Sequence, residues 1–320
     1  MEGLVHIEKI LSEENVEVLT VRWNFDDTLL AVGCSDNSVR VFNDQGLVSE
    51  LQCSRGTGYP VTSLRWKPAG GKTKNILLAC TSDGRYYQFH GPTGRMMHNE
   101  CLEHRQILAS DYSPDSAFFA LGCDDSHIRV IDDCTKTIVS TFGPQQGYIA
   151  GHISRVYAIK WSQPSVLISA GWDDKVIVWD IRSQRIQRVI LGPHICGDAL
   201  DIKDNIILTG SYFKKDQVQL WSLESGQNIH TSSLNAQGKT CLVYTAQFSK
   251  QQNCFIIGGS GSDEAYFFMN NPVRPLAILE NFTRPVYSVD FCNTNNKVAV
   301  GCGDGSTVLC SIDLTNYPIT

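Results

Sequence analysis

The feature that most constrains this chain is a short pattern repeated along its length. An acidic residue in a turn is followed, six residues later, by an apolar residue at a strand end. The pairs are Asp36 and Phe42, Asp83 and Phe89, Asp125 and Ile131, Asp173 and Trp179, Asp263 and Met269, and Asp304 and Cys310. A further unit ends at Trp221, six residues after Lys215. The seven strand ends are 47, 42, 48, 42, 48 and 41 residues apart, which indicates a unit of ~45 residues repeated seven times.

A second column of apolar residues keeps phase with the first. Ahead of each turn, an apolar side chain closes an earlier strand, and these residues are Trp23, Trp66, Tyr112, Trp161, Ile202, Phe248 and Phe291. Between the two columns lie runs such as LLAVGC, FFALGC and KVAVGC, which are typical of strands buried on both faces. The chain is therefore predicted to be all-β, with seven similar sheets.

The best-preserved unit spans residues 151–183, GHISRVYAIKWSQPSVLISAGWDDKVIVWDIRS. It reads as three strands, with a Gly-His dipeptide before the first and a Trp-Asp dipeptide closing the third. This unit resembles one blade of the WD-repeat β-propeller family. The resemblance implies a hydrogen-bonded set formed by His152, Ser169, Asp173 and Trp179. The indole donor, the hydroxyl, the imidazole and the carboxylate can pair in series and leave no buried polar group unsatisfied.

Seven such units predict a single seven-bladed β-propeller domain over residues 1–320. The seventh unit ends at about Ile312, too early for a fourth strand. Residues 4–11, LVHIEKIL, are strand-like and precede the first full unit, so we expect them to complete the last blade. Closing the ring in this way removes two open sheet edges, and it is similar to the closure common in that family.

Composition restricts the class of partner. The chain is 42% apolar and 19% charged, which is typical of a globular protein, and its formal net charge of -6 argues against general nucleic-acid binding. The amino terminus lacks the apolar core of a signal peptide, and no apolar run reaches the ~18 residues of a membrane span. The twelve cysteines contain no C-x-x-C motif. We therefore expect a cytoplasmic protein with reduced thiols, no membrane insertion and no zinc site.

Several motifs suggest chemistry, but each has a structural interpretation. His152, Asp173 and Ser169 have the composition of a hydrolase triad, yet Ser169 lies in the middle of a strand and not on an exposed elbow. Gly71-Lys72-Thr73 resembles the tail of a phosphate-binding loop, but the first glycine of that motif is absent. No catalytic residue, cofactor or small-molecule substrate is predicted.

Two columns of the repeat could ring the channel of a propeller. Cys34, Cys123 and Cys302 occupy one repeat position and suggest either a metal or redox site or simple packing of small thiols. The turn acids Asp36, Asp125, Asp173 and Asp304 suggest either a cation site or hairpin hydrogen bonds. We favour packing and hydrogen bonding, and predict no metal.

The predicted binding surface is one end of the propeller. Loops that enter first strands and turns between second and third strands should gather there, and they carry Tyr59, Arg105, Arg155, Trp172, Tyr212 and Arg284. Arginine and aromatic residues dominate binding hot spots. Three longer loops, residues 68–75, 142–150 and 211–216, provide further candidate contacts.

The favoured function is a non-enzymatic scaffold for protein–protein interactions, a subunit of a larger intracellular assembly of cytoskeletal, ciliary or transport type. The alternative is a substrate receptor of a cullin-based ubiquitin ligase, because Trp179-Asp180-Ile181-Arg182 fits a W-D-x-R pattern that resembles the adaptor-docking site of some WD-repeat proteins. A propeller enzyme and a nucleic-acid-associated factor are the remaining alternatives. The short basic groups that the latter would use are Lys72, Lys74, Lys214 and Lys215.

Overall fold

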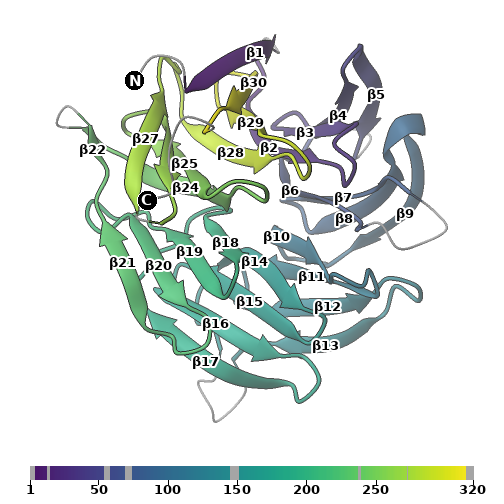
Figure 1. Ribbon diagram of the computed structural model, residues 1–320. Helices are drawn as coiled ribbons and strands as arrows, with labels where there is room; N and C mark the ends of the chain where they lie inside the picture. Colours follow the sequence, from purple (N-terminus) through teal and green to yellow (C-terminus); the bar gives the residue numbers. More distant parts are fainter. Residues whose placement is uncertain are drawn as a thin grey trace.

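The computed structural model describes residues 4–12, 15–53, 58–68, 74–144, 151–236, 239–271 and 273–314. Seven four-stranded antiparallel sheets are arranged around a central channel (Figure 1). The prediction of a seven-bladed β-propeller is confirmed. Among the described residues the one helix is the 3-10 segment η1 (Gly91–Thr93), and no helix there has the length and apolar character to cross a membrane.

The first four blades each take four consecutive strands. Blade 1 comprises β2 (Val18–Trp23), β3 (Leu30–Cys34), β4 (Ser38–Asn43) and β5 (Gly46–Gln52). Blade 2 comprises β6 (Val61–Trp66), β7 (Ile76–Thr81), β8 (Arg85–His90) and β9 (Arg95–Cys101). Blade 3 comprises β10 (Ile107–Tyr112), β11 (Phe118–Cys123), β12 (Ile128–Asp132) and β13 (Ile138–Phe142). Blade 4 comprises β14 (Val156–Gln163), β15 (Val166–Gly171), β16 (Lys175–Asp180) and β17 (Arg185–Leu191).

The remaining blades follow the same order until the chain ends. Blade 5 comprises β18 (Leu200–Lys203), β19 (Ile206–Gly210), β20 (Val218–Ser222) and β21 (Asn228–Ser232). A small hairpin, β22 (Asn235–Ala236) and β23 (Lys239–Thr240), follows it. Blade 6 comprises β24 (Leu242–Phe248), β25 (Cys254–Ser260), β26 (Ala265–Met269) and β27 (Arg274–Leu279). Blade 7 comprises β28 (Val286–Phe291), β29 (Lys297–Cys302), β30 (Ser306–Ile312) and β1 (Val5–Ser12).

The amino-terminal strand closes the ring, as predicted. β1 pairs antiparallel with β30, from Val5 opposite Ile312 to Ser12 opposite Ser306. Figure 1 shows the purple β1 beside the yellow β30. The strand begins and ends one residue later than the segment 4–11 expected from the sequence. This pairing leaves β1 instead of β30 as the outer strand of blade 7.

The acid of each repeat shapes the hairpin between the second and third strands. In four repeats the carboxylate accepts the N–H two residues further on: Asp36 from Ser38 (3.1 Å), Asp83 from Arg85 (3.4 Å), Asp125 from His127 (3.2 Å) and Asp304 from Ser306 (2.9 Å). The residue between them has positive φ, which Gly and Asn accept at low cost, as at Gly84 and Gly305. The acid column therefore encodes turns.

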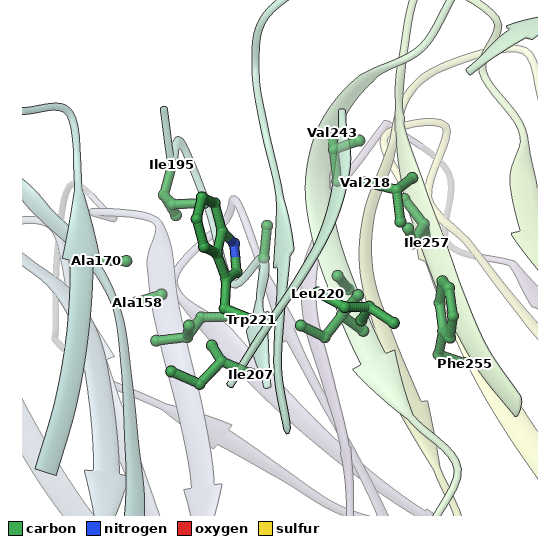
Figure 2. Close-up of a cluster of buried hydrophobic side chains, with 14 of the residues drawn as sticks. Ala158, Ala170, Ile195, Ile207, Val218, Leu220, Trp221, Val243, Phe255 and Ile257 are labelled. Atoms are coloured by element: carbon green, nitrogen blue, oxygen red, sulfur yellow. The ribbon is translucent and has the colours of Figure 1, made fainter. Parts of the chain in front are cut away.

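The core lies between blades. Figure 2 shows this at blade 5, where Trp221 points toward Ala158 and Ala170 of blade 4. The next residue, Leu220, points to the other face, toward Phe255 of blade 6. Side chains alternate across a strand, so both faces of a middle strand are buried. This explains the continuous apolar runs in the sequence.

Side-chain acceptors also join the inner strands of neighbouring blades. In four blades, the residue just before the apolar residue that closes the inner strand has a side chain that accepts a hydrogen bond from the next blade. The donor is the backbone N–H of the apolar residue that closes the inner strand of that next blade. The pairs, acceptor first, are Asp111 with Trp161 (2.9 Å), Asp201 with Phe248 (2.8 Å), Gln247 with Phe291 (2.6 Å) and Asp290 with Trp23 (2.6 Å). These bonds satisfy one backbone donor on the free edge of four inner strands, β14, β24, β28 and β2.

Some predicted features cannot be placed. Gly71-Lys72-Thr73 lies outside the described residues, as do residues 69–73 of the 68–75 loop and residues 145–150 of the 142–150 loop. The 211–216 loop is described in full.

Candidate functional site

The six residues expected to form a binding face lie at one end of the propeller, here called the upper face. Four of them stand one or two residues before the inner strands β6, β10, β14 and β28, namely Tyr59, Arg105, Arg155 and Arg284. Trp172 and Tyr212 stand just after the second strands β15 and β19. Each second strand runs antiparallel to its inner strand, so its end lies beside the start of that strand.

The six residues do not form one cluster. Arg105 is paired with Asp125 of its own blade, with 2.7 Å between Arg105 Nε and Asp125 Oδ2. Arg155 lies over the ring of Trp172, 5.4 Å from its centroid. Tyr59 and Arg284 belong to blades 2 and 7. The structure therefore brings together Arg155 and Trp172, and leaves the others apart from them.

Trp172 begins a stack of rings that runs from blade 4 to blade 5. It stacks on His194, with centroids 5.7 Å apart and planes 24° apart, and His194 stacks on Phe213 at 4.9 Å and 23°. His194 Nδ1 lies 2.6 Å from Asp174 Oδ1, which fixes the middle ring. Trp172 is 39% exposed and Phe213 45% exposed. We call Trp172, His194 and Phe213 the aromatic stack.

A row of tyrosines continues around the channel mouth. Tyr212 contacts Tyr244 at a centroid distance of 5.2 Å, and Tyr244 contacts Tyr287 at 5.3 Å. Burial raises the pKa of Tyr244 and of Tyr287 above the ordinary value, so both phenols stay neutral. Tyr157 is tilted against Trp172 of the aromatic stack, with ring centroids 5.7 Å apart.

Tyr157, Tyr244 and Tyr287 face the channel because each occupies a β-bulge in its inner strand. The register shifts at the same point in blades 1, 2, 3, 4, 6 and 7. A bulge redirects a side chain out of the ladder. Four residues before the closing apolar position, the chain carries Leu19, Thr62, Leu108, Tyr157, Asp198, Tyr244 and Tyr287. These residues line a cavity of about 220 Å³ in the upper channel.

A salt bridge closes the floor of this cavity. Asp198 of blade 5 meets Arg22 of blade 1 and Arg65 of blade 2, and the Arg65 Nη2 to Asp198 Oδ2 distance is 2.8 Å. Burial alone would raise the pKa of Asp198, but the charges of Arg65, Lys160 and Arg22 hold it well below the ordinary value. Both arginines also line a second cavity of about 230 Å³ toward the lower face. The bridge thus separates two cavities.

The polar set of blade 4, formed by His152, Ser169, Asp173 and Trp179, is buried and closed. Trp179 Nε1 donates to Ser169 Oγ (2.8 Å), His152 Nε2 lies 2.8 Å from the same oxygen, and His152 Nδ1 lies 2.9 Å from Asp173 Oδ1. Although burial raises the pKa of Asp173, the hydrogen bond and charge of His152 lower it below the ordinary value. His152 and Ser169 are 0% exposed, so no substrate reaches this serine. The set joins three segments of one blade.

A reduced form of that set occurs in blade 5, where sequence reasoning missed it. Trp221 Nε1 donates to Thr209 Oγ1 at 3.0 Å, and Thr209 is fully buried. Threonine replaces the serine, and its hydroxyl donates to Gln219 O (3.3 Å), whereas Ser169 bonds to a histidine.

The two columns considered for metals have local partners. Burial raises the pKa of Cys34 to about 11 and the pKa of Cys123 and Cys302 to about 12. These thiols are therefore protonated at neutral pH. In the part of the chain that the structure describes, no three His, Cys, Asp or Glu residues form a group suited to a metal ion.

Sequence reasoning missed His194 and Phe213 of the aromatic stack, the channel tyrosines Tyr157, Tyr244 and Tyr287, and Asp198 with its partners Arg22 and Arg65. His194 and Phe213 lie outside the repeated columns. Asp198 had a signal, because it stands four residues before Ile202, at the position that carries the bulge residue in the other six blades, and two residues before β18, the shortest inner strand. An alignment of that column would have shown a carboxylate among apolar and aromatic residues.

Comparison with known proteins gives two kinds of match. A family model described as the WD domain, G-beta repeat, matches residues 98–132, 143–180 and 273–310. A model described as the anaphase-promoting complex subunit 4 WD40 domain matches residues 6–69. The matches include the blade with the buried polar set and the last blade.

The chain is also similar to fly proteins named ribosome biogenesis protein WDR12 homolog. The protein of Drosophila persimilis is 24% identical over 293 residues, which cover 87% of this chain and 68% of that protein. The protein of Drosophila mojavensis is 24% identical over 296 residues, with the same coverage. The protein of Drosophila pseudoobscura pseudoobscura is 23% identical over 293 residues, again covering 87% and 68%.

Proposed function

Because the chain belongs to the WD-repeat β-propeller family, we propose that it acts without catalysis, as a scaffold that binds a protein partner on its upper face. The observation that carries this proposal is the exposed aromatic stack with Arg155 against it. Aromatic rings held by stacking lose little freedom on binding, which lowers the cost of association. The buried polar set offers no open nucleophile, and this supports the same conclusion.

We place this scaffold in an assembly that takes part in ribosome biogenesis. The support is the name of the fly relatives, ribosome biogenesis protein WDR12 homolog, and their alignment over 87% of the chain. These names do not support the cytoskeletal, ciliary or transport assemblies expected from the sequence.

The ligase-receptor alternative depends on Arg182. Asp180 Oδ1 accepts the N–H groups of Arg182 (2.9 Å) and Ser183 (3.2 Å), so the Asp of this pattern has a turn-forming role in the chain itself. Arg182 is exposed at the lower end of blade 4. The turn explains the motif without an adaptor, and the upper face is the better-supported surface.

The test is co-purification of the tagged full-length chain from the cells that express it. We expect ribosome assembly factors to co-purify, and the chain to co-sediment with precursor ribosomal particles. The variant Trp172→Ser with Arg155→Glu should lose the partner. The matched control is Arg182→Glu with Arg185→Glu, two exposed positions away from the upper face.

Two results would contradict the proposal in different ways. Loss of the partner in the control but not in the upper-face variant would assign binding to the lower face. Recovery of a cullin adaptor that depends on Arg182 would establish the ligase-receptor alternative.

A further inference from the structure

We propose that the aromatic stack and the basic residues beside it bind an acidic segment of the partner protein, anchored by a large apolar or aromatic side chain. This inference rests on the proposed scaffold function and deepens it, because it names the chemistry of the partner. We call the surface formed by Ile153, Arg155, Trp172, Phe213, Lys214 and Lys215 the upper basic patch.

The charges on this patch favour an acidic ligand. Arg155, Lys214 and Lys215 are exposed and make no ion pair among the described residues. The nearby acids Asp173 and Asp174 are already engaged. Asp173 is held by His152 (2.9 Å) and lies 3.7 Å from Lys175 Nζ, and Asp174 lies 2.6 Å from His194.

One acid opposes these cations. Asp216 is exposed next to Lys215 and makes no ion pair within the described ranges. Three unpaired cations against one unpaired carboxylate leave the patch positive, although the whole chain has a net charge of -6. A local field of opposite sign to the rest of the surface selects a ligand of opposite charge.

The apolar part of the patch favours an anchor side chain. Phe213 is 45% exposed at the end of the aromatic stack, and Ile153 is 60% exposed. The N–H of Ile153 donates to Asp173 Oδ2 at 3.0 Å, so its backbone is fixed. Fixed, exposed apolar side chains beside cations form the combination found at interface hot spots.

RNA is the other polyanion to consider, and the geometry favours protein. Single-stranded RNA binds by stacking successive bases on open ring faces. Arg155 and His194 already lie against the ring of Trp172, and His194 lies between Trp172 and Phe213. Bases would be left with Phe213, whereas an acidic peptide needs ring edges and cations, which the patch provides.

The experiment is peptide selection on the purified full-length chain. A display library of short random peptides is selected on the wild-type protein and counter-selected on Lys214→Glu with Lys215→Glu. Arg182→Glu with Arg185→Glu is the matched control, because it changes the net charge by the same amount at exposed positions outside the patch. A synthetic peptide of the enriched sequence is then titrated against all three proteins.

We expect the enriched peptides to combine acidic residues with an aromatic or large aliphatic residue. Their affinity should fall by about tenfold or more in Lys214→Glu with Lys215→Glu, remain near wild type in the control, and weaken as salt is added. Phe213→Ser should weaken the same peptides, with unchanged thermal stability.

Enrichment of neutral or basic peptides, failure to enrich acidic ones, or equal binding to the Lys214 and Lys215 variant would overturn the inference. If oligouridine binds more tightly than any selected peptide, and this binding is lost in the Lys214 and Lys215 variant, the patch binds RNA and not an acidic peptide. These outcomes leave the scaffold function standing if co-purification of the native partner is still lost in Trp172→Ser with Arg155→Glu. If peptide binding persists in Lys214→Glu with Lys215→Glu and the native partner still co-purifies with Trp172→Ser with Arg155→Glu, both the acidic-segment inference and the upper-face scaffold proposal are contradicted.

Discussion

Asp198 and Arg65 meet across the channel, with 2.8 Å between Asp198 Oδ2 and Arg65 Nη2. They come from blades 5 and 2, and Arg22 of blade 1 shares the same carboxylate. The two guanidinium groups are largely buried, at 7% and 9% exposure of the side chains. This contact joins opposite sides of the ring.

Replacing Asp198 by Asn should destabilise the propeller. Two buried guanidinium groups would lose their shared carboxylate, and removing one partner of a buried ion pair costs about 3 kcal/mol. Urea unfolding would measure this loss. The exposed Asp216→Asn is the control and should stay within about 0.5 kcal/mol of wild type. An unchanged stability of Asp198→Asn would show that the bridge contributes nothing net.

The stabilisation from Asp198 should depend on pH. Its pKa is lower in the folded chain than the ordinary value of 3.8 that applies on unfolding, so its stabilisation is complete above that value. It is lost as pH falls below that value toward the folded pKa. The stability difference between wild type and Asp198→Asn should therefore stay near its full value from pH 6 to about pH 4.5 and shrink as the pH falls from there to about pH 3. A constant or growing difference would contradict the depressed pKa.

Deleting residues 1–12 should open the ring. The deletion removes β1 and exposes β30, a paired strand in the intact chain, as a new sheet edge. We expect the midpoint of thermal unfolding to fall by on the order of 10 °C or more, with aggregation. Ile7→Thr with Ile10→Thr, at two exposed positions of β1, keeps the strand and should leave the midpoint near wild type. Equal midpoints for the truncated and intact chains would refute closure.

Ser169→Ala should cost more than Thr209→Val. The first change leaves both Trp179 Nε1 and His152 Nε2 without their shared partner, and the second removes only the acceptor of Trp221 Nε1. Burying an unpaired polar group costs ~1–3 kcal/mol, so we expect losses of about 2 and about 1 kcal/mol. Denaturant unfolding of the two variants measures which one loses more free energy of unfolding. A reversed order would mean that the blade 4 set is not the stronger one.

Thiol labelling should separate packing from redox chemistry. Burial raises the pKa of Cys80 and of Cys241 to about 12, and Cys134 is exposed. At pH 8, iodoacetamide should modify Cys134 rapidly and the buried thiols only after unfolding. Mass spectrometry of samples taken during labelling of the native protein gives the order in which the cysteines are modified. Fast modification of Cys34, Cys123 or Cys302 would revive the interpretation of that column as a reactive site.

Much of the fold could be predicted because its information is local. Four of the turn acids accept N–H groups two residues away, and the apolar runs follow from burial between blades. The pairing of β1 with β30 was also predictable, since the last unit lacked a strand and the first residues supplied one.

The candidate site was predictable only in part. Arg155 and Trp172 could be placed at one end because strand direction determines it. The inclusion of His194 and Phe213 in the same stack depends on how two loops fold over the junction of blades 4 and 5. The sequence also could not show which arginines are available for binding. Arg105 forms an ion pair with Asp125, whereas Arg155 forms no ion pair among the described residues.

The sequence by itself determined the number of blades, the turns between strands and the partner of the first strand, because each follows from spacing and from hydrogen bonds along neighbouring segments. Only the tertiary structure decided that Asp198 faces Arg22 and Arg65, and that Trp172, His194 and Phe213 form one exposed stack. Those contacts join residues of different blades. Their distances depend on how the blades are placed around the ring, and this placement is fixed only when all seven pack together.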